Sequence, residues 1–337
     1  MKAAVLYGAG DIRVEEVPEP TVEPGGVVIK VKACGICGSD LHGYRHGGRE
    51  GMRFGHEFSG DIVEIGDGVT GVETGDRVIA MSGKGCGECY WCRKGEFIRC
   101  SKLSLLGYGI PGAFAEYVAV PSFQIGRYAD KLPDSITYEE GATVEPVAVS
   151  LYAVRQVQPQ PEDTVVIIGL GILGLCIIPI LKSMGVKQVI ASGRREQRLK
   201  TAKEFGADVV VDAASEDIVP IVKGMNSGKG ADIVFDCAGS TATFQQSLDI
   251  IHRGSKIDLV GLYQEQISFN PSFLVSNDIM LIGCGLKWDL PGALELLRKG
   301  TVDTKPLITH QYPLDKVKEA FDTQVKAEDA IKVIVKP

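Results

Sequence analysis

The second half of the chain alternates short apolar stretches with amphipathic ones, and this alternation restricts its fold more than any other pattern in the sequence. The first strand candidate is the largely apolar stretch 164–169. Further strand candidates follow at intervals that leave room for a helix: 187–192, 209–212, 233–237, 255–260 and 280–283. Strands that alternate with helices form a parallel sheet with helices on its faces. This half of the chain therefore predicts an α/β domain with a doubly wound parallel sheet.

A glycine-rich turn follows the first of these strands, with the sequence Gly169-Leu-Gly171-Ile172-Leu173-Gly174. It opens an apolar helix expected over 173–181, which is the setting in which G-x-G-x-x-G binds a dinucleotide. In that motif the first glycine permits the tight turn, the second lets the backbone approach the pyrophosphate, and the third lets helix and strand pack closely. We expect this glycine turn to bind phosphate at the helix N-terminus. The alternative is a flexible loop of chance glycines.

The end of the second strand bears on which dinucleotide binds. An NAD site places an acidic residue there to accept the ribose hydroxyls, but this sequence has Ser192-Gly193-Arg194-Arg195. Two arginines offer planar charged forks to a 2′-phosphate, and Ser192 can donate a further hydrogen bond. We therefore favour NADP(H) over NAD(H). The alternative is that the arginines solvate the start of the next helix and pair with Glu196.

The first 150 residues are β-rich. Short β-branched runs bounded by Gly, Pro and Asp predict strands at 27–32, 60–66, 77–80 and 114–120. A helix is expected over 141–155, followed by a polar connector over 156–163, and the tail of the chain predicts a helix at 291–299 and a strand at 331–335. With 337 residues, the chain exceeds the usual size of one domain, so we expect two.

A run of four cysteines predicts a structural zinc site. Cys86, Cys89, Cys92 and Cys100 follow the spacing C-x2-C-x2-C-x7-C, and we call residues 86–100 the cysteine loop. Four thiolates at about 2.3 Å close a tetrahedral coordination sphere and leave no position for substrate. The alternative is a pair of disulfides, but the sequence shows no secretory signal, so reduced thiols and a metal are favoured.

A second set of metal ligands is spread over three segments. Cys37, the adjacent His56 and Glu57, and Glu145 are all competent zinc ligands. A thiolate, an imidazole and one carboxylate neutralise Zn²⁺ and leave a fourth position for water or substrate, whereas a second carboxylate makes the site net negative. We therefore expect one glutamate on the ion at a time, the other held close through water. Taken singly, His56 could equally be a core histidine and Glu145 a surface acid.

Composition agrees with a cytoplasmic enzyme. The net charge of −7 and the pI near 5.4 argue against a nucleic acid or an anionic membrane as partner. The start of the chain is a short apolar strand rather than a signal sequence, and no apolar run approaches transmembrane length.

These motifs together resemble the zinc-containing medium-chain dehydrogenases, the superfamily of alcohol, sorbitol and threonine dehydrogenases, over essentially the whole chain. The matching segments are the cysteine loop, the glycine turn and four others: Gly35–His42, Gly55–Gly60, Val144–Pro146 and Lys305–His310. The resemblance implies a GroES-like β-barrel catalytic domain formed by 1–150 and 290–337, and a Rossmann coenzyme domain over 151–289. It also implies two zinc ions per subunit and a homotetramer, with a dimer as the alternative.

Glu145 carries the resemblance further. The polyol and threonine dehydrogenase branch has glutamate in this ligand position, whereas liver-type alcohol dehydrogenases have cysteine. The resemblance therefore implies hydride transfer between NADP(H) and the secondary alcohol or ketone of a polyol, a diol or a sugar alcohol. The segment Tyr44–Arg53, which we call the arginine loop, contains three arginines and a histidine. A phosphorylated substrate is expected if any of them faces the active site, whereas the alternative is a solvated loop.

Two other functions remain open at this stage. The first keeps the fold but uses NAD and a threonine-like amino alcohol. The second is a catalytically silent, crystallin-like protein, against which the full set of ligands argues.

A proton relay is expected beside the second metal site. Ser39 lies two residues after Cys37, so its hydroxyl can bond the substrate oxygen and pass a proton onward. By the resemblance, His42 is the outer end of that relay. Asp40 is expected to orient His56. The resemblance also implies that Lys332, on the last strand, reaches the cofactor, whereas a solvated strand lysine is the alternative.

Overall fold

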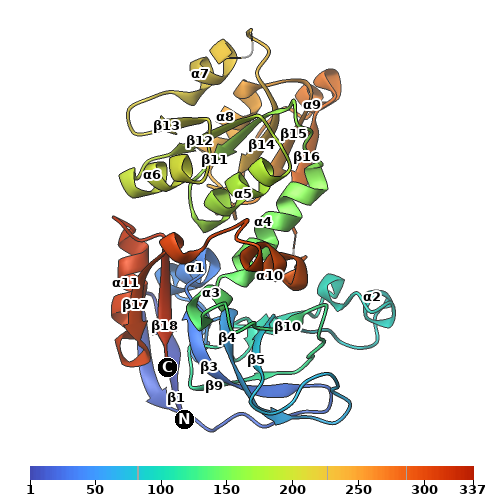
Figure 1. Ribbon diagram of the computed structural model, residues 1–337, viewed down its shortest axis with the longest axis vertical. Helices are drawn as coiled ribbons and strands as arrows, with labels where there is room; N and C mark the ends of the chain where they lie inside the picture. The colour runs from blue at the N-terminus through green and yellow to red at the C-terminus, as the bar shows by residue number, and fades with distance from the viewer. Residues whose placement is uncertain (82, 226, 286) are drawn as a thin grey trace. The chain divides into compact units, whose positions relative to one another are not determined.

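The computed structural model describes residues 1–81, 83–225, 227–285 and 287–337. It divides into two compact units, one formed by Met1–Ala148 with Leu286–Pro337 and the other by Val149–Gly285. The boundaries expected from the sequence stood at 150/151 and 289/290. Both chain termini belong to the first unit (Figure 1).

The second unit contains a six-stranded sheet in which all strand pairs are parallel. Its spatial order is β13-β12-β11-β14-β15-β16, formed by β11 (Thr164–Ile168), β12 (Gln188–Gly193), β13 (Val209–Asp212), β14 (Ala231–Asp236), β15 (Ile251–Leu259) and β16 (Met280–Gly283). The strand order reverses direction between β11 and β14, which defines the switch point where such sheets bind ligands. The predicted doubly wound parallel sheet is confirmed.

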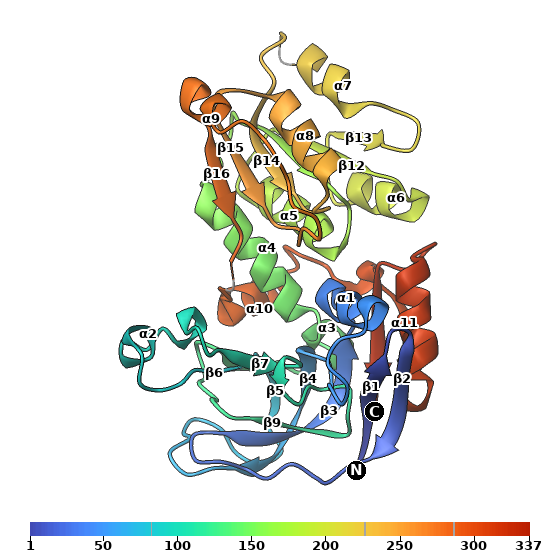
Figure 2. The same cartoon turned by 180° about the vertical axis from the view of Figure 1, so that it is seen from behind.

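Helices cover both faces of this sheet, α5 and α6 on one and α8 on the other (Figures 1 and 2). They are α5 (Ile172–Ser183), α6 (Glu196–Glu204), α7 (Ile218–Met225), α8 (Thr241–Ile250) and α9 (Ser272–Asn277). Because both faces are covered, every residue of β11 is buried. Burial on both faces explains why the sequence of this strand is continuously apolar rather than alternating.

The first unit is built around a larger, mostly antiparallel sheet. Its strand order is β10-β5-β4-β3-β18-β17, with β9 also paired to β3. The strands are β3 (Val27–Gly35), β4 (Glu57–Ile65), β5 (Arg77–Ala80), β9 (Tyr117–Val120), β10 (Ala129–Lys131), β17 (Ile308–Pro313) and β18 (Lys332–Lys336). Because β18 pairs with β3, the C-terminal segment completes a sheet that the N-terminal segment begins.

Further elements lie outside these two sheets, most of them in the first unit, while α4 continues from the first unit into the second. They are β1 (Lys2–Gly8), β2 (Asp11–Glu16), β6 (Gly83–Lys84), β7 (Ser104–Leu106), β8 (Gly109–Ile110), α1 (Gly38–His46), α2 (Tyr90–Arg93), α3 (Tyr138–Gly141), α4 (Val144–Val157), α10 (Leu290–Arg298), α11 (Val317–Lys326) and 3-10 turns at Phe97–Arg99, Lys305–Leu307 and Leu314–Lys316. A core rich in phenylalanine packs β1, α1 and α11 against the large sheet, and in it Phe321 of α11 contacts Phe54 and Phe114. Among all described helices, none is long and apolar enough to cross a membrane.

The helix expected over 141–155 corresponds to α4. The short helix α3, which the sequence did not predict, precedes it, and the Thr137 side chain caps α3 by exchanging hydrogen bonds with Glu140. α4 begins at Val144, which places Pro146 in its first turn. A proline is tolerated there because the N–H it lacks would have no partner within the helix.

Candidate active site

Three strands bring a buried ion pair together beside Gly35. Gly35 of β3 lies opposite Glu57 of β4 and opposite Ile334 of β18. Lys332 of β18 donates hydrogen bonds to Glu57 Oε2 at 2.5 Å and to the Ile36 carbonyl at 2.9 Å. Both charged side chains are only 2% exposed. A Cβ atom on Gly35 would come within 2.6 Å of Glu57 Oε2, so only glycine leaves room for the pair.

Local backbone structure also positions Cys37 and His56, whose side chains can bind a metal. Cys37 is the N-cap residue of α1, and its backbone N–H donates to Asp40 Oδ2 at 3.0 Å. His56 immediately precedes β4 and follows Gly55, whose φ of +104° belongs to the left-handed region that favours glycine. A Cβ atom on Gly55 would lie 2.8 Å from Cys34 Sγ. The backbone around His56 therefore requires a glycine.

The structure brings three of the four predicted ligands into one group. Donor atoms of Cys37, His56 and Glu57 all lie within 4.8 Å of one another. Glu145, in the first turn of α4, is not part of that group. Its Oε1 accepts a hydrogen bond from the indole N–H of Trp288 at 2.6 Å. Glu145 is thus buried at the site but held by a partner that the sequence did not reveal.

The electrostatics of this cluster favour a bound cation. Burial raises the pKa of Glu145 to about 7; His56 opposes this shift, whereas the charge of Glu57 adds to it. Burial by itself lowers the pKa of His56, but the charges of Asp40 and Cys37 outweigh it and raise that pKa well above its usual value. Acidic groups and a thiol therefore crowd a buried space. A thiolate, an imidazole and carboxylates are the donor set that zinc prefers, so these residues fit the ion.

Asp40 lies beside His56 without bonding it. Its Oδ1 is 3.7 Å from His56 Nδ1, a charge contact longer than a hydrogen bond. Among the described residues, His56 Nδ1 has no hydrogen-bond partner. Asp40 Oδ1 instead accepts from the Tyr108 hydroxyl at 3.3 Å, and the Tyr108 ring lies 5.9 Å from the His56 ring. This link through Tyr108 has no signal in the sequence pattern.

The predicted relay residues both lie on α1. Ser39 is partly exposed and His42 is exposed, with its ring 4.7 Å from that of His46. Burial raises the pKa of Tyr108. A hydrogen bond between the side chains of Ser39 and Tyr108 lowers that pKa and so opposes the effect of burial. The relay itself stays a prediction, as does the contact between Lys332 and the cofactor, because the Lys332 ammonium is here engaged by Glu57.

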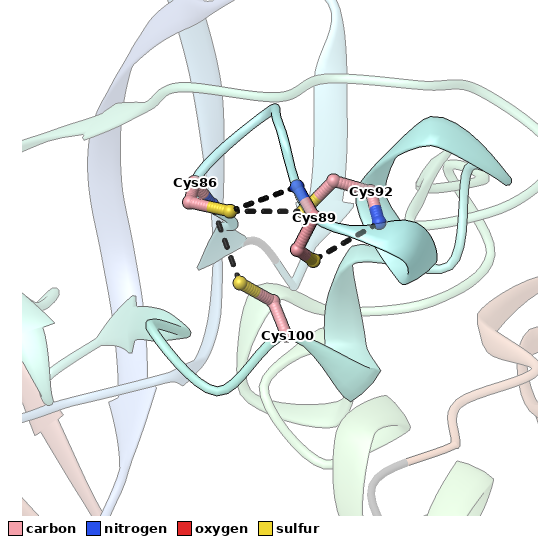
Figure 3. A group of neighbouring side chains, drawn as sticks. All are labelled: Cys86, Cys89, Cys92 and Cys100. Carbon is pink, nitrogen blue, oxygen red and sulfur yellow. Dashed lines mark hydrogen bonds between the residues drawn. The ribbon is translucent and has the colours of Figure 1, made fainter.

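The four sulfurs of the cysteine loop converge on one point (Figure 3). All of them lie within 4.8 Å of one another, and Cys86 Sγ is 4.0 Å from Cys92 Sγ. Tetrahedral coordination at about 2.3 Å sets sulfur-to-sulfur separations just under about 4 Å. All nine cysteines belong to the described residues and none of them forms a disulfide bond, so the disulfide alternative finds no support.

Backbone N–H groups also point at these sulfurs. Cys86 Sγ accepts from the N–H of Cys89, Cys89 Sγ from that of Cys92, and Cys100 Sγ from that of Cys86. Such bonds stabilise thiolates and lower the pKa of Cys89 and of Cys100. The loop therefore fits a tetrathiolate zinc site.

The glycine turn in the second unit has the geometry expected of it. Gly169 adopts φ +100°, and a Cβ atom there would lie 2.7 Å from the Ala238 nitrogen. Gly174 packs against the Gly169 carbonyl, which a Cβ atom would approach to 2.1 Å. Around Gly171, the N-cap residue of α5, a Cβ atom would meet nothing within 4 Å. This open space, followed by Ile172 and Leu173 at the helix start, leaves the backbone accessible to phosphate.

The last two residues of β12 and the two arginines that follow them differ in exposure. Arg194 and Arg195 are exposed, Gly193 is packed against Leu170, and Ser192 is buried. A third arginine, Arg198, lies close to them. Burial lowers its pKa, and the neighbouring charge of Arg195 lowers it further. The turn is thus more strongly cationic than the sequence pattern indicated.

Comparison with known proteins places this geometry in a family. Residues 23–130 match the model described as the alcohol dehydrogenase GroES-like domain, and residues 173–299 match the model described as zinc-binding dehydrogenase. Sorbitol dehydrogenase of Bacillus subtilis is 33% identical, with 100% of this chain and 97% of that protein covered. (R,R)-Butanediol dehydrogenase of the same organism is also 33% identical, with both chains fully covered.

A solved structure agrees with these relatives. It is that of a zinc-binding dehydrogenase from Sinorhizobium meliloti 1021 bound to NADP, which is 29% identical with a TM-score of 0.90 and covers 100% of this chain and 99% of that chain. A GroES-like domain followed by a zinc-binding dehydrogenase region defines a zinc-type oxidoreductase. This chain belongs to the zinc-containing medium-chain alcohol dehydrogenase superfamily. It is an enzyme that acts on small-molecule alcohols with zinc and a nicotinamide cofactor, and the predicted GroES-like and Rossmann folds are confirmed.

Proposed function

We propose that this enzyme transfers a hydride between NADP(H) and the secondary alcohol or ketone of a polyol, sugar alcohol or diol. The observation that carries the proposal is the group formed by Cys37, His56 and Glu57, whose donor atoms lie within 4.8 Å of one another. Sorbitol and butanediol, named in two relatives, are both alcohols with several hydroxyl groups. We infer a substrate of this kind for the present chain.

Cys37 and His56 would hold the catalytic zinc together with one carboxylate. We infer that this carboxylate is Glu57, because it belongs to the same group as Cys37 and His56, whereas Glu145 Oε1 accepts a hydrogen bond from Trp288. When bound, the zinc supplies a Lewis acid that polarises the substrate oxygen. The cysteine loop would hold a second zinc with a purely structural role.

The proton of the substrate hydroxyl is assigned to Ser39. Ser39 lies on the first turn of α1, two residues beyond Cys37, and this place supports a hydroxyl close to the metal ligands. Ser39 would accept the proton and His42, exposed on the same helix, would release it to solvent. Asp40 would keep Cys37 in place through the backbone N–H that it accepts.

The coenzyme is assigned to the glycine turn and to the arginines after β12. Arg194 and Arg195 are exposed and no acidic side chain precedes them at the strand end, which suits a 2′-phosphate. The charge of nearby Arg198 strengthens the local positive potential. Buried Ser192 would support this turn and could add a hydrogen bond to the phosphate.

Initial rates test the proposal. Purified enzyme is assayed with NADP⁺ and with NAD⁺ on sorbitol, 2,3-butanediol and threonine. A clear preference for NADP⁺ with a polyol or diol supports it. A preference for NAD⁺ would mean that the arginines only solvate the start of α6. Oxidation of threonine alone would favour the NAD-linked oxidation of an amino alcohol instead. No oxidation with either coenzyme overturns the proposal.

The resemblance also underlies a proposed assembly. We infer a homotetramer located in the cytoplasm, with a dimer as the alternative. Light scattering on the purified enzyme gives the mass that distinguishes the two.

A further inference from the structure

A cavity next to the candidate metal site is lined by part of the arginine loop. Its volume is about 440 Å³, and it lies between residues 49–53 and residues 107–111, all in the first unit. Arg49, Glu50 and Arg53 bring the charged groups to its wall. Two cations thus face a single anion, and we call this space the arginine cavity.

Arg53 is the unusual member of this wall. Its side chain is partly buried, and burial lowers the pKa of its guanidinium, with no charged neighbour contributing to the shift. No ion pair or side-chain hydrogen bond within the described part of the chain engages it. A partly desolvated cation without a counter-charge costs free energy, and an anion entering the cavity would recover it. Glu50 does not fill this place, since it is exposed and its charge acts on Tyr7.

The arginine cavity adjoins the residues that bind the metal. Tyr108 lines it, and the same side chain donates to Asp40 Oδ1 at 3.3 Å and lies with its ring 5.9 Å from that of His56. Arg53 is also only three residues before His56 along the chain. Cys37, His56 and Glu57 do not line the cavity themselves, so a substrate that reaches both the metal ligands and Arg53 would have to pass the Tyr108 side chain.

We propose that the arginine cavity binds an anionic end group of the substrate, with Arg53 as its main partner and Arg49 as a second, more exposed one. The proposal rests on the function proposed above and narrows its substrate class. The substrate is then a polyol that ends in a carboxylate or a phosphate, both of which the planar guanidinium binds through paired hydrogen bonds. Arg53 acts as a residue that determines specificity and takes no part in hydride transfer.

A matched set of substrates tests this assignment. Initial rates are measured with sorbitol, sorbitol 6-phosphate and gluconate for wild type, Arg53→Met and the control Arg45→Met. Arg45 lies on the same loop, but its guanidinium donates to the Val325 carbonyl at 3.3 Å and it does not line the cavity. Zinc content and circular dichroism are compared first, so that a misfolded variant is recognised.

The expected result is a kcat/KM at least about 10-fold higher for one of the two anions than for sorbitol. Arg53→Met should lower the kcat/KM for that anion by about 10- to 100-fold, because a charge-assisted hydrogen bond is lost. It should leave the kcat/KM for sorbitol within about 3-fold, and Arg45→Met should change neither. The anion with the higher kcat/KM identifies the end group as a phosphate or a carboxylate.

Two outcomes overturn the proposal. If sorbitol is oxidised as well as both anions, or if Arg53→Met affects all three substrates alike, the cavity does not recognise charge, while the proposed function stands. If no substrate is oxidised, the proposed function fails, and calorimetric titration of zinc-loaded enzyme with sorbitol 6-phosphate, gluconate and sorbitol decides the inference separately. If the wild type binds one anion more tightly than sorbitol and Arg53→Met loses this difference, the arginine cavity binds anions as proposed. Equal binding of all three compounds would exclude it.

Discussion

Glu57 and Lys332 form a buried ion pair that joins the two ends of the chain. Lys332 Nζ lies 2.5 Å from Glu57 Oε2, across the space that Gly35 leaves open. Glu57 begins β4 and Lys332 begins β18, so the pair ties an N-terminal strand to the last strand. It also fixes the carboxylate that belongs to the candidate metal group.

Loss of Lys332 should destabilise the protein strongly. In protein from which zinc has been removed with a chelator, Lys332→Met leaves Glu57 as an unpaired buried charge, and breaking a buried pair from one side costs about 3–5 kcal/mol. The double variant Glu57→Gln/Lys332→Met removes both charges and should be more stable than Lys332→Met alone. Urea unfolding of the wild type and of the three variants, including Glu57→Gln, measures these differences in the free energy of unfolding.

Lys336 provides the matched control on the same strand. It pairs with Glu139, but its side chain is 47% exposed, so Lys336→Met should change the free energy of unfolding by no more than about 1 kcal/mol. Equal effects of the two lysine substitutions, or a double variant that is less stable than Lys332→Met, would show that the pair does not act as described.

Asp258 should give the stability of the second unit a particular pH dependence. It is fully buried on β15, and burial raises its pKa from 3.8 to about 7, although Gln156 donates to both carboxylate oxygens. Because folding raises the pKa of this carboxyl, its protonated form is favoured in the folded state. The contribution of Asp258 to the free energy of unfolding is therefore fully present below about pH 4 and is lost as the pH rises to about 7. The free energy of unfolding of Asp258→Asn should therefore match that of the wild type near pH 4. At pH 8 it should be higher than that of the wild type by at most roughly 4 kcal/mol.

Denaturant unfolding of both proteins between pH 4 and pH 8 checks this expectation. The difference between the two curves isolates Asp258, since all other titrating groups are shared. Parallel curves, or a wild type that gains stability relative to Asp258→Asn as the pH rises, would contradict the assignment.

The cysteine loop should hold one zinc that other cysteines do not influence. Cys100→Ala removes one of four ligands, so the purified variant should contain about one zinc less per subunit and unfold at a lower temperature. Cys176, buried in α5 of the second unit, supplies the control. Metal analysis should find the zinc content of Cys176→Ala unchanged, and an unchanged zinc content in Cys100→Ala would refute the structural site.

Ser39 should be needed for turnover and not for metal binding. Ser39→Ala removes the hydroxyl that accepts the substrate proton and should lower kcat by about 10²- to 10⁴-fold, with the zinc content unchanged. Ser39→Thr keeps a hydroxyl and should retain much more of the activity. Near-normal turnover by Ser39→Ala, measured with the best polyol and coenzyme, would exclude the relay.

The sequence predicted the second unit more completely than the first. Its central strand β11 is buried along its whole length and reads as an apolar run, and the glycine turn follows this strand directly. The short helix α3 was not predicted because Thr137, which caps it, lies outside the apolar pattern. In the first unit, the pairing of β18 with β3 depends on contacts between residues about 300 positions apart, which local patterns do not encode.

The site was predictable in its ligands and not in their partners. Cysteine spacing and the His56-Glu57 pair identify metal donors because few other uses require those residue types together. The role of Lys332 was less visible, although a single lysine within the apolar run 331–335 is a signal of a buried partner. The bonds from Trp288 to Glu145 and from Tyr108 to Asp40 join distant segments, and only the fold reveals them.

The most direct test of the account measures zinc and turnover on the same samples of wild type and Cys37→Ser. Cys37 belongs to the group that includes His56 and Glu57, and the cysteine loop forms a separate group. We expect two zinc ions per subunit and polyol oxidation for the wild type, and one zinc with no measurable oxidation for a folded Cys37→Ser. A Cys37→Ser enzyme that keeps both zinc ions, or that oxidises the polyol at the rate of the wild type, would contradict it.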